Sequence, residues 1–442
     1  MDGIVDRLDR FSKRYYPDPI VFTITLTLLT ILICLFMTDV TPMGIITLWG
    51  DGLPTLLTFM AQLSLTFVFS FTLANTGPVS AGLKRLARIP GSARQAFVLV
   101  ALITSGLALI TWSLGFVGGA IIARAVAKEI SAKGIGLNYP LLVACAYAAT
   151  CVWHMGYSSS AALFVATEGH ALEAMMGVIP VTETVFTTWN GLIIIAAIIA
   201  ICATALVLHS ENNVTEPPID DTAASQPSDS TETTPAEAIE NSRVLTLALA
   251  GVLALYLGQK IMSGTFSIDL NTVNWSLLLA CLLFARSPRQ LTDLMGQSGP
   301  VVAPILLHYP FYAGMMSLMV GSGLVAILAG GLVAIATPET LPFFAFLSGG
   351  LLNIFIPSGG GQWAVQGPVF VDAANALNVP AEQIVMAVAY GDQWTNLIQP
   401  FWALPMLAIA GLQVRQILGY CVFFLLSLGA VFGGGLLIVA ML

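Results

Sequence analysis

The chain of 442 residues is 57% hydrophobic and only 9% charged, whereas soluble globular proteins carry about 25% charged residues. This composition excludes an ordinary water-soluble domain. The formal net charge of −8 has a local source, because eight acidic and no basic residues lie between His209 and Ser242, and the other 16 acids match the 16 bases. A basic surface for nucleic acid is therefore excluded. The six cysteines lack metal-ligand spacing, so neither a metal nor a cofactor is expected.

Seven uninterrupted apolar stretches approach the ~20 residues that a helix needs to cross a bilayer. They fall at about 20–38, 53–74, 186–208, 244–262, 270–285, 299–320 and 417–441. Four more contain Gly, Ser or Pro interruptions, at about 96–127, 139–167, 341–371 and 383–411. We expect the first and third of these to be re-entrant hairpins and the other two to be broken helices. The predicted fold is an all-α polytopic membrane protein with nine crossings.

Basic residues predict the orientation of these spans. With the N-terminus in the cytoplasm, fifteen of the 16 Lys and Arg residues fall on cytoplasmic segments and only Lys260 falls outside, as the positive-inside rule requires. The C-terminus is then on the outer side of the membrane. Segment 209–243 is rich in Pro, Ser, Thr and acids, so we predict a disordered cytoplasmic linker there.

The two halves of the chain share a weak repeat with an offset of 243 residues. Without a gap, Gly115, Gly118, Ala144, Ala146 and Tyr147 correspond to Ser358, Gly361, Ala387, Ala389 and Tyr390. Residues 1–208 and 263–442 each contain two spans, a hairpin, a broken helix and a final span, and the joining helix 244–262 inverts the second copy. Glycine-broken segments at matching positions of an inverted repeat indicate a binding site in transporter folds.

A Pro-Ser-Gly-Gly-Gly-Gln-Trp string at 357–363 lies inside the second predicted hairpin. Glycines leave backbone N–H groups open to a ligand, and successive N–H groups can form a concave anion site. The alternative is that the glycines only allow close helix packing. Polar neighbours favour a carboxylate site, for which the candidates are Ser358, Gly359, Gly360, Gly361, Gln362, Trp363 and Gln366.

The second broken helix contains the most polar stretch of any span, at 390–400. Asp392 is the only acid predicted well inside the membrane, where a charge is costly and therefore suggests function. With Thr395 and Asn396 it would bind a proton or a sodium ion, and Gln393 and Gln399 would contact substrate. A structural carboxylate near a helix end is the alternative.

The corresponding break in the first half is at 153–160. Ser158, Ser159 and Ser160 precede an apolar helix, whose N-terminus favours an anion, although serines also bond to helix carbonyls without any function. The partner hairpin is predicted to turn near 112–119. His154 and His308 are candidate proton relays, and neutral structural histidines are the alternative. With no Lys or Arg at mid-span, an anionic substrate would need a co-bound cation, H⁺ or Na⁺.

Taken together, several motifs resemble the bacterial short-chain fatty acid transporters, over nearly the full length. They are Tyr-Pro-Asp-Pro at 16–19, Trp-Gly-Asp-Gly at 49–52, Pro-Phe-Tyr-Ala-Gly at 310–314, Pro-Ser-Gly-Gly-Gly at 357–361, Gln-Gly-Pro at 366–368, Ala-Tyr-Gly-Asp-Gln-Trp at 389–394 and Gln-Pro-Phe-Trp-Ala-Leu-Pro at 399–405. In that family Glu can replace Asp392, which supports a carboxylate there. Neither His154 nor His308 is a fixed feature of the family, which weakens the case for either histidine as a proton relay.

The resemblance implies a member of the ion-transporter superfamily, in the bacterial inner membrane with its C-terminus in the periplasm, with elevator-like alternating access. The predicted function is secondary import of a short monocarboxylate, butyrate or acetoacetate, with a cation. A cation/proton antiporter using Asp392 is the alternative. A membrane hydrolase or acyltransferase is disfavoured because no Ser or Cys lies in a motif with a base at reach. A homodimer would suit an elevator.

Overall fold

The computed structural model describes residues 17–210, 214–217, 234–265 and 270–442. In these ranges the chain forms helices, turns and one isolated β-bridge, between Asn138 and Thr215. Seven of the described helices are long and apolar enough to cross a membrane: Pro19–Met37, Pro42–Asn75, Ala93–Ile110, Thr188–Leu208, Arg243–Met262, Val302–Gly321 and Val414–Ala440. The predicted all-α polytopic membrane fold is therefore confirmed.

Capping side chains mark many helix starts. Asp18, Ser92 and Asn138 each accept a hydrogen bond from a backbone N–H in the first turn of the helix that follows, and such caps stabilise a helix by about 1 kcal/mol.

The helices of the first half are α2 (Pro19–Met37), α3 (Pro42–Gly52), α4 (Leu57–Asn75), α5 (Gly77–Ala87), α6 (Ala93–Ile110), α7 (Trp112–Ala132), α8 (Tyr139–Ala149), the 3₁₀ helix η1 (Thr150–Met155), α9 (Ser160–Val165), α10 (Glu173–Met176) and α11 (Thr188–Leu208).

The second half follows the same order after two connecting helices. It comprises α12 (Pro235–Glu240), α13 (Arg243–Met262), α14 (Leu270–Phe284), α15 (Pro288–Gly296), α16 (Gly299–Gly321), α17 (Leu324–Val333), α18 (Leu341–Asn353), α19 (Gly359–Leu377), α20 (Ala381–Thr395), α21 (Pro400–Ala410) and α22 (Val414–Ala440).

Both segments predicted as re-entrant hairpins form antiparallel helix pairs, and their re-entrance stays a prediction. In the first, a Cβ added to Gly115 would lie 2.7 Å from the Cβ of Ala108, and one added to Gly119 would lie 2.7 Å from Cγ2 of Thr104. The chain turns at Thr111, so the predicted turn at 112–119 is wrong: these residues form the start of α7. In the second hairpin the turn covers 354–358, and the three glycines of the string form the first turn of α19.

Both predicted helix breaks are present, and both are shorter than the polar stretches that predicted them. The first is the non-helical segment 156–159 between η1 and α9. The second is 396–399, because α20 continues to Thr395. Asp392 therefore lies within the last turns of a helix and not in unwound chain.

The repeat is visible in how the helices pack. With the 243-residue offset, α4 corresponds to α16, α6 and α7 to α18 and α19, α8 to α20, and α9 to α21. Helices of one half pack on helices of the other in matching pairs. The contact of α2 with α16 corresponds to that of α14 with α4, and the contact of α7 with α21 corresponds to that of α19 with α9. The packing supports an internal repeat, and the inverted orientation of its second copy stays a prediction.

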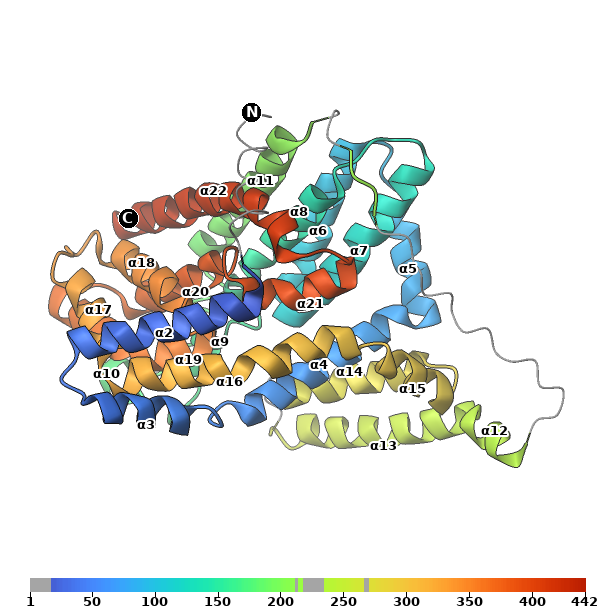
Figure 1. Ribbon diagram of the computed structural model, residues 1–442, viewed down its shortest axis with the longest axis horizontal. Coiled ribbons are helices and arrows are strands. Elements are labelled where there is room, and N and C mark those ends of the chain that lie inside the picture. The colour runs from blue at the N-terminus through green and yellow to red at the C-terminus, as the bar shows by residue number, and fades with distance from the viewer. Residues whose placement is uncertain (1–16, 211–213, 218–233, 266–269) are drawn as a thin grey trace.

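Two groups of helices are apparent in Figure 1. The peripheral group consists of α2, α3, α4, α13, α14, α15 and α16, in the lower part of the view, with α2 above α16. The core group consists of α6, α7, α8, η1, α9, α11, α18, α19, α20, α21 and α22, and supplies most of the buried apolar cluster. Hairpins and breaks all belong to the core group.

The predicted linker 209–243 falls partly outside the described residues, at 211–213 and 218–233. Thr215 pairs with the turn between α7 and α8, through Thr215 N–H to Leu137 O at 2.9 Å and Tyr139 N–H to Thr215 O at 3.2 Å. Disorder is wrong for 235–240, which form α12. A capping box between Thr234 and Glu237 starts this helix because it satisfies otherwise unbonded N–H groups.

Candidate functional site

A cavity of about 520 Å³ lies where the two hairpin turns, the first break and the start of α21 meet. From the core group it is lined by Thr111, Trp112, Phe116, Trp153, Ser158, Ser160, Leu163, Phe164, Thr167, Ser358, Gly359, Gly360, Gly361 and Trp402. Leu56 and Phe59 at the start of α4, together with Val273 on α14, line it from the peripheral group. The cavity thus lies between the two groups.

One wall of the cavity is aromatic. The rings of Trp112 and Trp402 are 5.9 Å apart in edge-to-face contact, and Phe116 stacks on Trp402 at 5.8 Å. Trp153 also lines the cavity and stacks on the adjacent His154 ring at 4.1 Å. The sequence prediction missed this wall, because its members come from separate segments and resemble ordinary apolar core residues.

Another part of the cavity lining is the N-terminus of α19. The N–H groups of Gly359, Gly360 and Gly361 make no hydrogen bond within the described structure, and Ser358 provides no side-chain cap. A Cβ on Gly360 would meet nothing closer than Ser160 Cβ, at 3.5 Å, whereas a Cβ on Gly359 would lie 2.5 Å from Cε1 of His154. Gly360 thus has room for a side chain, and Gly359 is held against the imidazole.

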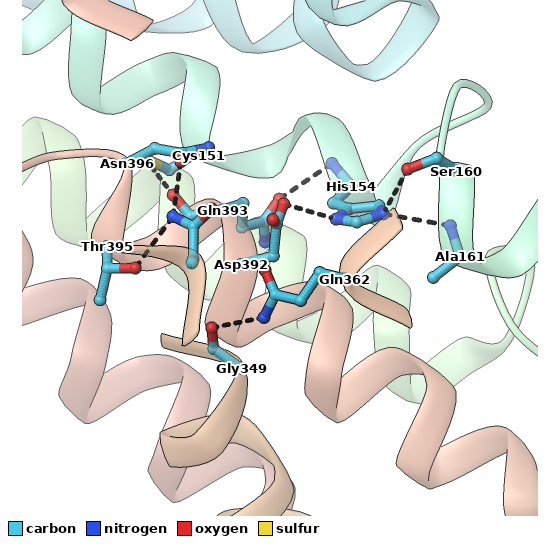
Figure 2. Close-up of polar contacts among 11 residues, drawn as sticks. Cys151, His154, Ser160, Ala161, Gly349, Gln362, Asp392, Gln393, Thr395 and Asn396 are labelled. Carbon is cyan, nitrogen blue, oxygen red and sulfur yellow. Dashed lines mark hydrogen bonds and ion pairs between the residues drawn. The ribbon is translucent and has the colours of Figure 1, made fainter. Parts of the chain in front are cut away.

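His154 connects the start of α9 to Asp392, as Figure 2 shows. Its Nδ1 is 3.1 Å from Oδ2 of Asp392, and its Nε2 is 3.1 Å from Ser160 Oγ and 3.2 Å from the backbone N of Ala161. The backbone N–H of His154 donates to Gln393 Oε1 at 2.9 Å. The family resemblance disfavoured a functional role for His154. This residue nevertheless contacts three other candidates, Ser160, Asp392 and Gln393.

These contacts determine which nitrogen of His154 carries the proton. A backbone N–H only donates, so the Ala161 contact requires Nε2 to accept. The imidazole proton must then be on Nδ1, where it is donated to the Asp392 carboxylate. Ser160 Oγ–H donates to Nε2 as well. Because Ala161 shares the Nε2 lone pair, His154 is not a free base for Ser160.

Ser160, His154 and Asp392 form a hydrogen-bonded series that the sequence pattern did not indicate. His154 is six residues away from Ser160 in the chain and approaches it only because the segment between η1 and α9 folds back. The Asp392 side chain is buried, with 2% of the residue exposed. Among the buried residues of the described chain it is the only acid, and none of these residues is Lys or Arg. Its charge has no buried basic partner there.

Amide side chains join the second break to α18. Asn353 Nδ2 donates to Thr395 Oγ1 at 3.0 Å and to Asn396 Oδ1 at 2.7 Å, and Thr395 Oγ1 donates to Gly350 O at 2.8 Å. Gln399 Nε2 donates to Asn353 O at 3.1 Å. Thr395, Asn396 and Gln399 therefore hold α18 to the break, through Asn353, a residue that the sequence prediction missed.

The remaining predicted residues lie away from the cavity lining. Gln362 donates to Gly349 O at 2.6 Å and Gln366 accepts from Ser348 at 3.3 Å, so both tie the arms of the second hairpin together. Trp363 and Ser159 are buried but do not line the cavity. His308 on α16 donates through Nδ1 to Pro304 O of its own helix, at 2.7 Å.

Comparison with known proteins agrees with this architecture. The model of the short chain fatty acid transporter family matches residues 1–439. The chain belongs to this family. It is 38% identical to a protein of Escherichia coli (strain K12) over 99% of both chains, and 34% identical to one of Haemophilus influenzae over 98% of this chain and 99% of the other. Both relatives are named for short-chain fatty acid transport. The protein is a multi-pass membrane transporter and not an enzyme.

Solved structures show a more distant similarity to this transporter. The YdaH transporter of Alcanivorax borkumensis is 15% identical, with a TM-score of 0.47 and coverage of 95% of this chain and 98% of the other. MtrF of Neisseria gonorrhoeae is also 15% identical, with a TM-score of 0.39 and coverage of 97% and 96%.

Proposed function

We propose that the transporter imports short monocarboxylates, such as butyrate and acetoacetate, together with a cation. The observation that carries this proposal is the cavity wall formed by the first turn of α19, where three N–H groups have no partner among the described residues. A carboxylate placed there would accept these bonds and interact favourably with the helix dipole, by about 0.3–1 kcal/mol.

The aromatic wall suits the other end of such a substrate. Trp112, Phe116 and Trp402 offer apolar surface to a short hydrocarbon chain, and burial of each CH₂ group is worth about 0.8 kcal/mol. An organic substrate explains why a cavity of about 520 Å³ is present. An ion-only antiporter using Asp392 needs no such cavity, so we favour import of a carboxylate.

Coupling is assigned to Asp392. No Lys or Arg is among the residues lining the cavity, so an entering carboxylate adds charge that basic side chains do not balance. Either H⁺ or Na⁺ bound at Asp392 would compensate, because an uncompensated buried charge is costly. Binding of the anion and the cation would then favour each other.

Movement of the core group against the peripheral group would expose the cavity to either side in turn. The position of the cavity between the two groups supports such an elevator. The charge pattern supports a cytoplasmic N-terminus and a periplasmic C-terminus. We propose that the peripheral group forms the stationary part, in a homodimer.

Uptake into proteoliposomes tests this function. Purified protein is reconstituted, and entry of labelled butyrate and acetoacetate is measured in exchange for unlabelled acid inside, without an ion gradient. Protein-free liposomes correct for diffusion of the neutral acids. We expect exchange with these acids and not with a dicarboxylate of equal length. Absence of exchange for every short monocarboxylate would contradict the proposed function.

A further inference from the structure

A chain of hydrogen-bonding groups runs from the cavity to the buried acid. Ser160 lines the cavity, its Oγ is 3.1 Å from His154 Nε2, and His154 Nδ1 is 3.1 Å from Asp392 Oδ2. The imidazole is fully buried, and Trp153 covers one of its faces. Ser160 is therefore the member of this chain that an entering substrate or water would meet.

We propose that the coupling ion is a proton and that it reaches Asp392 through Ser160 and His154. This inference rests on the proposed function of the cavity, and it assigns the coupling route of the same site. It gives Ser160 the role of a proton relay in place of the substrate contact predicted from sequence.

In this relay three protons move, each from one group to the next. A proton donor in the cavity, either water-borne H₃O⁺ or the carboxylic acid form of the substrate, gives a proton to Ser160 Oγ. Ser160 gives its own proton to Nε2 of His154, and the Nδ1 proton passes to the Asp392 carboxylate. The net change is one proton lost from the cavity and one gained by Asp392, while the imidazole remains neutral with its proton on Nε2.

This change of tautomer has a mechanical consequence. Nε2 accepts from the Ala161 N–H before transfer, at 3.2 Å, and after transfer two N–H groups face each other. The contact must open, which displaces either the imidazole or the start of α9. Gly359 lies directly against the same part of the ring. Proton binding at Asp392 would therefore disturb the first turn of α19, where the carboxylate binds.

The neighbouring thiol and hydroxyl groups are hydrogen-bonded to other acceptors. Cys151 Sγ donates to Gln393 O at 3.3 Å, Tyr147 OH donates to Asn396 O at 2.5 Å, and Tyr390 OH donates to Asn190 Oδ1 at 2.6 Å. Each has its own acceptor away from the carboxylate. In the buried set of described residues, no second acid and no Lys or Arg accompanies Asp392.

Transport with Ser160→Ala tests the relay. With an imposed pH gradient and a pH-sensitive dye inside the proteoliposomes, wild-type protein should accumulate acetoacetate and carry protons inward with it. Ser160→Ala should lose both, down to the protein-free level. Ser160→Thr keeps the hydroxyl and should restore accumulation. Ser105→Ala removes a buried hydroxyl that donates to Ala149 O and should behave as wild type.

Two outcomes of that assay would overturn the relay. One is proton uptake with each acetoacetate in Ser160→Ala that equals the wild-type value. The other is wild-type accumulation that follows a sodium gradient and ignores a pH gradient. Loss of exchange by the wild type would instead contradict the proposed function.

A spectroscopic test does not depend on transport. The chain has four histidines, so ¹⁵N-histidine labelling, with assignment by His154→Gln, resolves the ring nitrogens of His154. At high pH we expect the tautomer with its proton on Nδ1, and acidification should move the proton to Nε2 in wild type and not in Asp392→Asn. A proton on Nε2 at every pH would overturn the inference.

Discussion

Nδ1 of His154 lies 3.1 Å from Oδ2 of Asp392, although 238 positions separate the two residues in the chain. His154 belongs to η1 in the first half and Asp392 to α20 in the second. This hydrogen bond joins the helical segments that directly precede the two breaks. His154 and Asp392 are the groups proposed to carry the coupling proton. The glycine turn at 359–361 is the proposed site of the carboxylate.

Asp392→Asn should abolish coupled accumulation while leaving the protein folded. The amide oxygen of Asn can still accept from His154 Nδ1–H, but the side chain no longer binds a proton. Accumulation of labelled acetoacetate under a pH gradient and the melting temperature should be measured together. Asp372→Asn, at an exposed acid on α19, is the matched control. Normal accumulation in Asp392→Asn would remove this carboxylate from the mechanism.

Gly360→Val should weaken substrate binding without lowering stability. A Cβ there would make only ordinary van der Waals contact, 3.5 Å from Ser160 Cβ, so the valine methyl groups would occupy the proposed carboxylate site. The measurement is the concentration of butyrate that half-saturates exchange, which should rise. An unchanged value would favour the interpretation that the glycines serve only helix packing.

Gly359→Ala should act differently from Gly360→Val. Its Cβ would lie 2.5 Å from Cε1 of His154 and 2.7 Å from Ser160 Oγ, and overpacking of this kind costs about 1–3 kcal/mol. We expect a lower melting temperature together with impaired accumulation. A melting temperature equal to that of wild type would show that the turn and the imidazole are not in contact.

Trp402→Leu should shift the preference of the transporter toward longer acids. The indole forms part of the aromatic wall and contacts both Trp112 and Phe116, so a smaller side chain enlarges the apolar end of the cavity. The ratio of hexanoate to butyrate exchange should rise, since each added CH₂ group gains about 0.8 kcal/mol when buried. A fall in both rates with an unchanged ratio would place the hydrocarbon chain elsewhere.

Thr395→Val should destabilise the transporter. It removes the donor to Gly350 O and the acceptor for Asn353, and unsatisfied buried groups cost about 1–3 kcal/mol each. The melting temperature should fall relative to wild type and to Thr47→Val, a control at an exposed position on α3. Equal melting temperatures for the two variants would show that this contact contributes little.

The sequence predicted both hairpins, both breaks and the two features that matter most for the proposed site, the glycine string and Asp392. These were visible because polar or flexible residues inside an apolar segment are costly in a membrane. The position of each break was less predictable. The predicted break at 390–400 starts too early, since Gly391 lies within α20. Gly391 instead allows close packing, because a Cβ there would clash with the carbonyl of Phe346.

Long-range pairing accounts for what the sequence could not show. Nothing in the local pattern near His154 indicates that Asp392 is its partner, and a family in which this histidine is not fixed gave a reason to discount it. Asn353 resembled an ordinary helix end, and Trp112 and Trp402 resembled core residues. Only the folded chain brings the two aromatic residues to one cavity wall.

The most direct test of the central claim is a structure of the transporter with a heavy-atom analogue, 3-bromopropionate, after confirming that it competes with labelled butyrate. The account predicts the carboxylate at hydrogen-bond distance from the N–H groups of Gly359, Gly360 and Gly361, with anomalous bromine density against Trp112 and Trp402. Bromine density outside this cavity, with the first turn of α19 unbound, would contradict it.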